Sequence, residues 1–110
     1  MPKLVFSEPE REVREFDLQP GVYHLGREEG NEIILIDQKA SRQHACLRYD
    51  SQASTLTLED LKSSNGTYLN GAKLEGEKHL QSEDEIIIGL TRIRLVAPEL
   101  EEDGICIDIS

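Results

Sequence analysis

KSSNGTYLNG, residues 62–71, is the stretch that does most to decide the fold of this chain. Two Asn-Gly pairs enclose the short apolar run Thr67-Tyr68-Leu69. Because Asn and Gly tolerate positive φ, the backbone is predicted to turn tightly, run extended and turn again, which gives a loop, a strand and a second loop. The hydroxyls, amide and backbone N–H groups of the first loop suit an anion, and a polar hairpin turn without a ligand is the alternative.

The rest of the chain continues this pattern of short strands. Runs with period-two alternation recur about every ten residues, and none keeps the helical spacing of apolar residues over the length that a helix needs. The sequence therefore predicts an all-β fold, an 11-stranded β-sandwich of two twisted, largely antiparallel sheets. The expected strands are Lys3–Phe6, Glu12–Asp17, Gly21–Leu25, Glu32–Ile36, His44–Tyr49, Thr55–Asp60, Thr67–Asn70, Ala72–Leu74, Lys78–Gln81, Glu85–Ile88 and Thr91–Ala97.

Two of these strands carry apolar residues at successive positions. The runs Ile33–Ile36 and Ile86–Ile88 lack the alternation that is clear in Thr91–Ala97. A run that is apolar on both faces is typical of a strand covered on both sides. We therefore expect both runs to be more deeply buried strands or strand ends.

The composition indicates one acidic domain of modest size. With 110 residues the chain is long enough for a single core and too short for two. Its net charge of -10 opposes a phosphate backbone, so we expect no nucleic-acid binding. No apolar run approaches the roughly 20 residues that span a bilayer, and Met1–Phe6 lacks the apolar core of a secretory signal. The sequence therefore predicts no membrane segment and a cytoplasmic location.

The number and spacing of the cysteines and histidines do not indicate a metal site, a disulfide or a cofactor site. Cys46 and Cys106 are too few and too far apart for a zinc site, and we expect two free thiols, with Cys46 packed inside a strand. His24 and His79 stand alone, without metal-ligand spacing. We therefore expect no metal site and no cofactor.

Three polar blocks follow one another at the junctions of predicted strands and loops. They are Gly26-Arg27, then Ser41-Arg42-x-His44, then Ser64-Asn65-Gly66-Thr67 with Asn70-Gly71. In order and spacing, these blocks resemble the signature of the forkhead-associated (FHA) domain, a phosphothreonine-binding module. The resemblance runs from Lys3 to Ala97 and implies an FHA domain over residues 1–97, with the binding loops at one end of the sandwich.

The resemblance also implies a role for individual residues of the blocks. Arg27 and Ser41 would contact the phosphate, and Arg42 would contact the phosphate or the peptide backbone. Ser64 would donate a hydrogen bond to the phosphate. Asn65 would bind the main chain of the ligand and hold the peptide extended across the loops.

Further residues would tune or support this site. An apolar contact for the threonine methyl group is expected near Asn65, Gly66 and Thr67. Lys39 would read the ligand position three residues after the phosphothreonine, and a solvated loop lysine is the alternative. Residues 37–43 contain neither Gly nor Pro, so we expect side-chain hydrogen bonds to hold this connection. Structural support of the loops is expected from Gly26, His44, Asn70 and Gly71.

Two other interpretations of these residues stay open at this point. Arg27 can also be a solvated strand-end arginine that pairs with Glu28 or Glu29. Ser41 and His44 can be written as part of a catalytic triad, but they lie three residues apart at a strand entrance, and no nucleophile elbow surrounds the serine. We therefore expect no catalytic residue and no enzyme.

The sequence thus predicts an adaptor domain that docks a phosphothreonine-containing protein downstream of a Ser/Thr kinase, as a monomer. The alternative is a phospho-independent protein–protein assembly module. It would use the same loops or a strand in the acidic extension, residues 98–110, where Ile105, Ile107 and Ile109 alternate. A truncated linker is the other interpretation of that extension.

Overall fold

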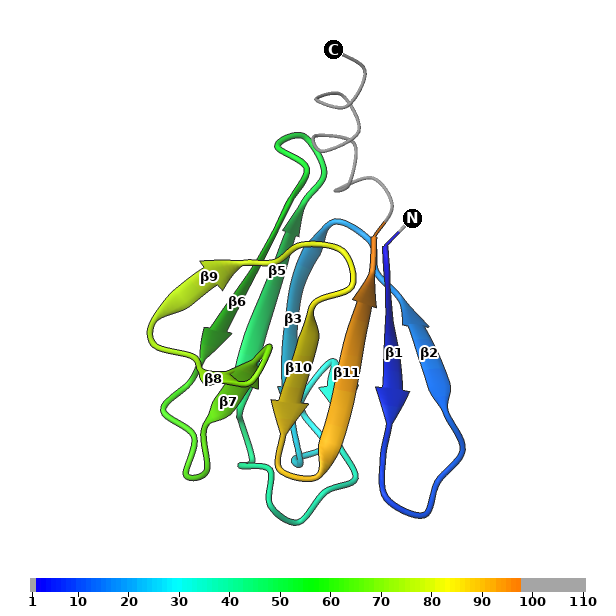
Figure 1. Ribbon diagram of the computed structural model, residues 1–110, viewed down its shortest axis with the longest axis vertical. Helices are drawn as coiled ribbons and strands as arrows, with labels where there is room; N and C mark the ends of the chain where they lie inside the picture. The colour runs from blue at the N-terminus through cyan, green and yellow to red at the C-terminus, as the bar shows by residue number, and fades with distance from the viewer. Residues whose placement is uncertain (1, 98–110) are drawn as a thin grey trace.

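The computed structural model describes residues 2–97, and these form eleven strands in two sheets (Figure 1). The all-β sandwich predicted from the sequence is confirmed. The strands are β1 (Lys3–Ser7), β2 (Arg14–Asp17), β3 (Gly21–Gly26), β4 (Ile33–Ile34), β5 (Ala45–Asp50), β6 (Thr55–Asp60), β7 (Thr67–Leu69), β8 (Ala72–Lys73), β9 (Glu77–His79), β10 (Glu85–Ile88) and β11 (Thr91–Val96).

The two sheets differ in size and interleave along the chain. One has six strands in the order β2-β1-β11-β10-β7-β8, and the other has five in the order β4-β3-β5-β6-β9. Strand pairing is antiparallel apart from β3 with β4, which is parallel. Consecutive strands therefore cross between the sheets several times, and these crossings bring distant loops together.

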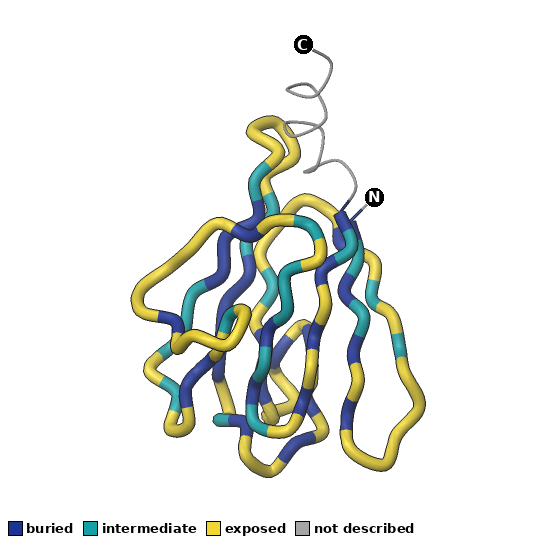
Figure 2. The backbone as a smooth tube through the Cα atoms, in the orientation of Figure 1, coloured by how far each residue is buried: buried dark blue, intermediate teal, exposed yellow. Residues whose placement is uncertain are grey.

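The core lies between the sheets and is built from alternate residues of each strand. In the six-stranded sheet Leu4 pairs with Leu95 and Phe6 with Ile93, and all four side chains are fully buried. Leu58 and its neighbours on β5 and β6 meet them from the other sheet. Figure 2 shows the resulting alternation of buried and exposed positions along the strands. Burial of this interior supplies most of the driving force for folding.

The expectation that Ile33–Ile36 is buried on both faces is wrong. The exposed fractions along this run alternate, at 1% for Ile33, 38% for Ile34, 1% for Leu35 and 50% for Ile36. The physical reason is the position of β4, which is short and forms the edge of its sheet, so that only one face meets the core. In Ile86–Ile88 the first and last residues are buried and the middle one is half-buried.

The free edge of β4 is closed by a half-buried ion pair from the other sheet. Arg14 Nε donates to Glu8 Oε1 at 2.9 Å, and Glu8 is only 5% exposed. Arg14 Nη2 also donates to the Ile34 carbonyl at 2.9 Å, and the Ile36 N–H donates to Glu8 Oε2 at 3.1 Å. These backbone groups are the ones that an added strand would use, so side chains occupy them instead.

The two ends of the sandwich are different. The loops that follow β4 and β6 gather at the lower end of Figure 1, whereas β1 begins and β11 ends at the opposite end. Within residues 2–97 no helix is long and apolar enough to cross a membrane, and no cluster of His, Cys, Asp or Glu is suited to a metal ion. Cys46 is a buried free thiol, as expected. The expected strand of residues 98–110 and Cys106 lie outside the described residues.

Candidate functional site

The chain segment after β3 and the β4–β5 loop are joined through their backbones. The Arg27 N–H donates to the Ser41 carbonyl at 3.0 Å, and the Glu28 N–H donates to the Arg42 carbonyl at 3.3 Å. Asn31, which is buried, donates from Nδ2 to the carbonyls of Glu28 and Arg42 at 2.8 and 2.7 Å. The first two sequence blocks therefore form one rigid unit.

Gly26 is required by this close approach. A Cβ placed on Gly26 would collide with the backbone carbonyl of Arg42 and would lie 2.8 Å from Asn31 Nδ2. A side chain at this position would push the two segments apart, because the opposing atoms belong to backbone or to an amide held by two hydrogen bonds. The close approach of the two segments thus requires a residue without a side chain at the position before Arg27.

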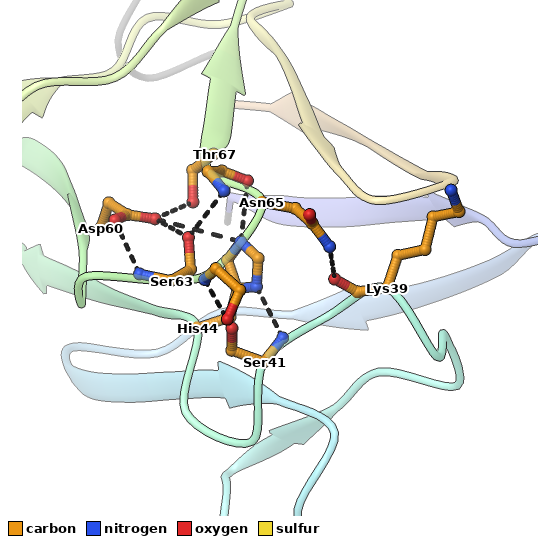
Figure 3. A network of polar contacts seen from close by, with 9 residues as sticks. Lys39, Ser41, His44, Asp60, Ser63, Asn65 and Thr67 are labelled. Atoms are coloured by element: carbon orange, nitrogen blue, oxygen red, sulfur yellow. Dashed lines mark hydrogen bonds and ion pairs between the residues drawn. The ribbon is translucent and has the colours of Figure 1, made fainter.

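His44 joins the β4–β5 loop to the β6–β7 loop. Its side chain is fully buried, its Nδ1 accepts a hydrogen bond from the Ser41 N–H at 2.9 Å, and its Nε2 lies 2.9 Å from the Gly66 carbonyl (Figure 3). Because Nδ1 accepts, the ring is neutral and Nε2 carries the proton that it donates to Gly66. The imidazole therefore joins two loops through residues that lie 22 positions apart in sequence.

Asp60 anchors the β6–β7 loop from the end of β6. Its carboxylate accepts from the Ser63 N–H at 3.1 Å, from Ser63 Oγ at 2.5 Å and from Thr67 Oγ1 at 2.7 Å (Figure 3). Burial raises the pKa of this carboxyl, but the hydrogen bonds from Ser63 and Thr67 outweigh it, so the pKa lies below its ordinary value. The group is held as a carboxylate that fixes the shape of the loop.

Two further contacts join the loops at their outer surface. The Ser64 N–H donates to Ser41 Oγ at 3.0 Å, and Asn65 Nδ2 donates to the Lys39 carbonyl at 2.8 Å. These bonds leave the Ser41 hydroxyl proton, the exposed Ser64 hydroxyl and Asn65 Oδ1 available to a ligand. The second and third sequence blocks therefore present donors and acceptors on one surface.

Asp37 fixes the start of the β4–β5 loop. It accepts from the Lys39 N–H at 2.9 Å, the Leu90 N–H at 2.7 Å and Thr91 Oγ1 at 2.8 Å. Burial raises the pKa of Asp37, and the hydrogen bonds, led by that of Thr91, lower it by more, so that the pKa lies below its ordinary value. The prediction that side-chain hydrogen bonds hold this connection is confirmed.

Three cations of these loops stand outside the ion pairs of the described residues. Arg27 is exposed, and its Nε donates to the Ala40 carbonyl at 3.1 Å, which orients the guanidinium and leaves both Nη groups free. Within residues 2–97, Arg27, Lys39 and Arg42 form no ion pair, so the pairing of Arg27 with an adjacent glutamate does not occur there. By contrast, carboxylates pair with Lys3, Arg14, Arg48, Arg92 and Arg94.

Not every residue singled out in the sequence joins this surface. Thr67 is fully buried and turned toward Asp60, so it cannot itself contact a ligand methyl group in this conformation. Asn70 and Gly71 form the β7–β8 turn, with φ of 50° and 90°. The Asn70 side chain accepts from the Glu85 N–H at 2.9 Å, and within residues 2–97 no hydrogen bond joins this turn to the loops of the site.

Four residues organise the site in ways that the sequence did not assign to them individually, although Ser63 lies in the loop expected to offer donors and Asp37 in the connection expected to be held by side-chain hydrogen bonds. They are Asn31, Asp37, Asp60 and Ser63. Asp60 and Ser63 had a local signal, because an Asp at a strand end followed by Ser three residues later is typical of a side-chain-capped turn. Asn31 and Asp37 also bind partners far away in sequence, at Arg42 and Thr91, and a local pattern does not show those distant contacts.

Comparison with known proteins places these features in a family. A family model described as the FHA domain matches residues 23–89. An FHA domain-containing protein of Arabidopsis thaliana is 38% identical over 90 residues, which covers 80% of this chain and 23% of that protein. The chain thus spans about a quarter of the length of this curated relative.

Solved structures agree with that match. The FHA domain of the CT664 protein from Chlamydia trachomatis superposes with a TM-score of 0.80 at 30% identity, covering 87% of this chain and 96% of the other. A second structure, from a structural and functional analysis of phosphothreonine-dependent FHA domain interactions, has a TM-score of 0.75 at 29% identity and covers 87% and 95%.

Proposed function

This chain belongs to the family of FHA domains, and on that premise we propose that residues 1–97 bind phosphothreonine-containing segments of partner proteins. The observation that carries the proposal is the group of exposed cations Arg27, Lys39 and Arg42 at the loop end of an acidic protein, which form no ion pair within residues 2–97. A phosphothreonine carries about -1.5 to -2 charges at neutral pH and three acceptor oxygens. It therefore matches both the charge and the donors of this surface.

The phosphate is bound by two arginines and two hydroxyls. Arg27 offers its two Nη groups, which the hydrogen bond to Ala40 holds in place. Ser41 and Ser64 donate their hydroxyl protons, and Arg42 adds a second fixed charge on the same loop. Backbone and side-chain hydrogen bonds hold Arg27 and the loops that carry these groups before the ligand arrives, which lowers the entropic cost of binding.

The peptide itself is held by the β6–β7 loop. Asn65 keeps Oδ1 free for a main-chain N–H of the ligand while its amide nitrogen binds the Lys39 carbonyl. The threonine methyl group packs beside Asn65 and Gly66. Lys39 is exposed and its side chain extends away from the Asp60 cluster (Figure 3), where it reads the position three residues after the phosphothreonine.

The strength of such a site is set by a few charged hydrogen bonds. Each is worth on the order of 1.5–3 kcal/mol. After the costs of association, three or four of them reach roughly micromolar affinity. FHA domains are non-catalytic binding modules, so the chain acts as an adaptor that docks a substrate of a Ser/Thr kinase without altering it.

The test is fluorescence polarisation with matched peptides that carry phosphothreonine, phosphoserine or threonine in a degenerate background. Wild-type protein is expected to bind the phosphothreonine peptides alone. The Arg27→Ala and Ser41→Ala variants are expected to lose about tenfold or more in affinity, since each removes a charge-assisted hydrogen bond. Arg92→Ala is the matched control, because this exposed arginine on β11 pairs with Glu85 and lies outside the loops.

Equal affinities of the Arg27→Ala and Arg92→Ala variants would contradict the proposed phosphate site. Binding to a partner that persists after phosphatase treatment would favour the phospho-independent assembly module instead. The strand proposed for that module, within residues 98–110, stays a prediction.

A further inference from the structure

An open groove lies beside Arg27, outside the proposed phosphate site. It has a volume of about 1130 Å³ and runs between the β1–β2 loop, residues 8–13, and the end of β4 with the segment after it, residues 34–38. Both segments lie at the same end of the sandwich as the binding loops (Figure 1). Pockets that bind small ligands have volumes of roughly 300–1,000 Å³, so this groove is large enough for a short peptide segment.

Exposed apolar side chains gather in this groove. Val13 is 62% exposed, Ile36 is 50% exposed and Ile34 is 38% exposed, and all three line it. Among residues 2–97 the other large exposed apolar side chains are Val22, Tyr68 and Leu90. Half of the large apolar residues that face water in this part of the chain are therefore concentrated at one place, which is a mark of an interaction surface.

The floor of the groove is held by an ion pair and by a contact between an arginine and an aromatic ring. Arg14, which also lines the groove, is held by the Glu8 carboxylate and lies over the Phe6 ring, with its guanidinium carbon 4.6 Å from the ring centroid. Because Glu8 and Arg14 occupy the backbone groups of Ile34 and Ile36, an occupant cannot add a strand to the edge of β4. It has to dock through its side chains.

Arg27 connects this groove to the phosphate site, since its side chain lines the groove and is the first phosphate contact of the proposed function. A peptide whose phosphate meets Arg27 brings its flanking residues to the mouth of the groove. The groove also carries Glu10 and Glu12 on one side and Arg11 between them, so charges of both signs line its rim and favour neither an acidic nor a basic occupant over an uncharged one. We propose that the groove binds an apolar side chain, such as Leu or Ile, of the same phosphothreonine-bearing segment. This inference rests on the proposed function and adds a second recognition element to it.

The test uses fluorescence polarisation with a short peptide that has one central phosphothreonine in a Gly-Ser background. Leucine, aspartate or lysine is placed in turn at each flanking position. Leucine is expected to tighten binding about five- to tenfold at one or two neighbouring positions on one side of the phosphothreonine, as partial burial of one apolar side chain predicts. Aspartate at the same positions is expected to give no gain.

Matched variants locate the effect. The double variant Ile34→Thr, Ile36→Thr keeps β-branched side chains and is expected to remove the gain from leucine while leaving the affinity for the Gly-Ser phosphopeptide unchanged. Val22→Thr, at a position on β3 that is 49% exposed and outside the groove, is expected to keep the gain. Circular dichroism checks that both variants are folded.

Other outcomes separate the groove from the phosphate site. Phosphothreonine-dependent binding without any preference for leucine, or a preference that survives the double variant, would overturn the groove as a peptide site and leave the proposed function intact. No phosphothreonine-dependent binding would remove the proposed function and this inference with it. A dimer in analytical ultracentrifugation that the double variant dissolves would assign the groove to a second copy of the chain and also overturn the inference.

Discussion

Replacing His44 by Phe tests whether one imidazole joins the two loops. The substitution keeps a ring of similar size in a fully buried position, so it leaves little cavity. It removes both hydrogen bonds of the side chain, and so the Ser41 N–H and the Gly66 carbonyl lose their partners. The His44→Phe variant thus loses hydrogen bonds while its packing stays nearly the same.

The expected loss of stability follows from how far each partner is buried. Gly66 is buried, so its carbonyl stays unsatisfied and costs about 1–3 kcal/mol. Ser41 is half-buried, so water reaches its N–H more easily and the cost is nearer to about 1 kcal/mol. The sum is about 2–4 kcal/mol in the free energy of unfolding. At a slope of about 2 kcal/mol per molar urea, the midpoint falls by roughly 1–2 M.

Urea unfolding followed by circular dichroism measures this directly. His79→Phe is the control, because this histidine on β9 is exposed and makes no side-chain hydrogen bond within residues 2–97. Its midpoint is expected to stay near that of the wild type. If His44→Phe unfolds at the same urea concentration as His79→Phe, the two hydrogen bonds do not hold the loops, and the bracing role of His44 is wrong.

Three further outcomes are expected. Gly26→Ala should lower the unfolding free energy by about 1–3 kcal/mol, measured by urea, because its Cβ meets the Arg42 carbonyl, whereas Gly30→Ala, which faces open space, should not destabilise. For Asp60 the folded-state pKa lies below the ordinary value, so its carboxylate stabilises the folded protein at neutral pH and this contribution is lost as the pH falls below about 4. Urea unfolding between neutral and acid pH should therefore show a smaller loss of stability in Asp60→Asn than in the wild type, and equal losses would refute the assignment. On a peptide array, an acidic or polar residue three positions after the phosphothreonine should be preferred about two- to fivefold over Lys or Arg, as a contact with the exposed Lys39 predicts, and the reverse preference would rule that contact out.

The sequence was most informative where the physics is local. Alternation of apolar residues located the strands, since a sheet with one covered face requires it, and the Asn70–Gly71 pair marked a turn because both residues adopt positive φ. The burial of Ile33–Ile36 was predicted wrongly because it does not depend on local sequence. Which strand lies at the edge of a sheet depends on the whole topology, and no feature of that run carries this information.

In the candidate site too, the sequence revealed features that depend on local pattern and not those that depend on distant contacts. The residues with free donors, such as Arg27 and Ser64, were found because they stand in recognisable blocks. The residues that hold the blocks in place, Asn31 and Asp37, bind groups elsewhere in the chain, and the sequence did not identify these distant partners. The groove escaped notice because Val13 and Ile36 are distant in sequence and become neighbours only after the sheets have packed.

The positions of the first residue of β1 and the last residue of β11 govern how this domain can be handled and joined to other sequences. Because β1 begins and β11 ends at the end opposite the loops, a tether attached at either side leaves the loops pointing away from the support (Figure 1). Immobilised through such a tether, the protein is expected to offer these loops to solution. Within a longer polypeptide the same arrangement lets neighbouring segments vary in length and kind while the loops stay accessible to a partner.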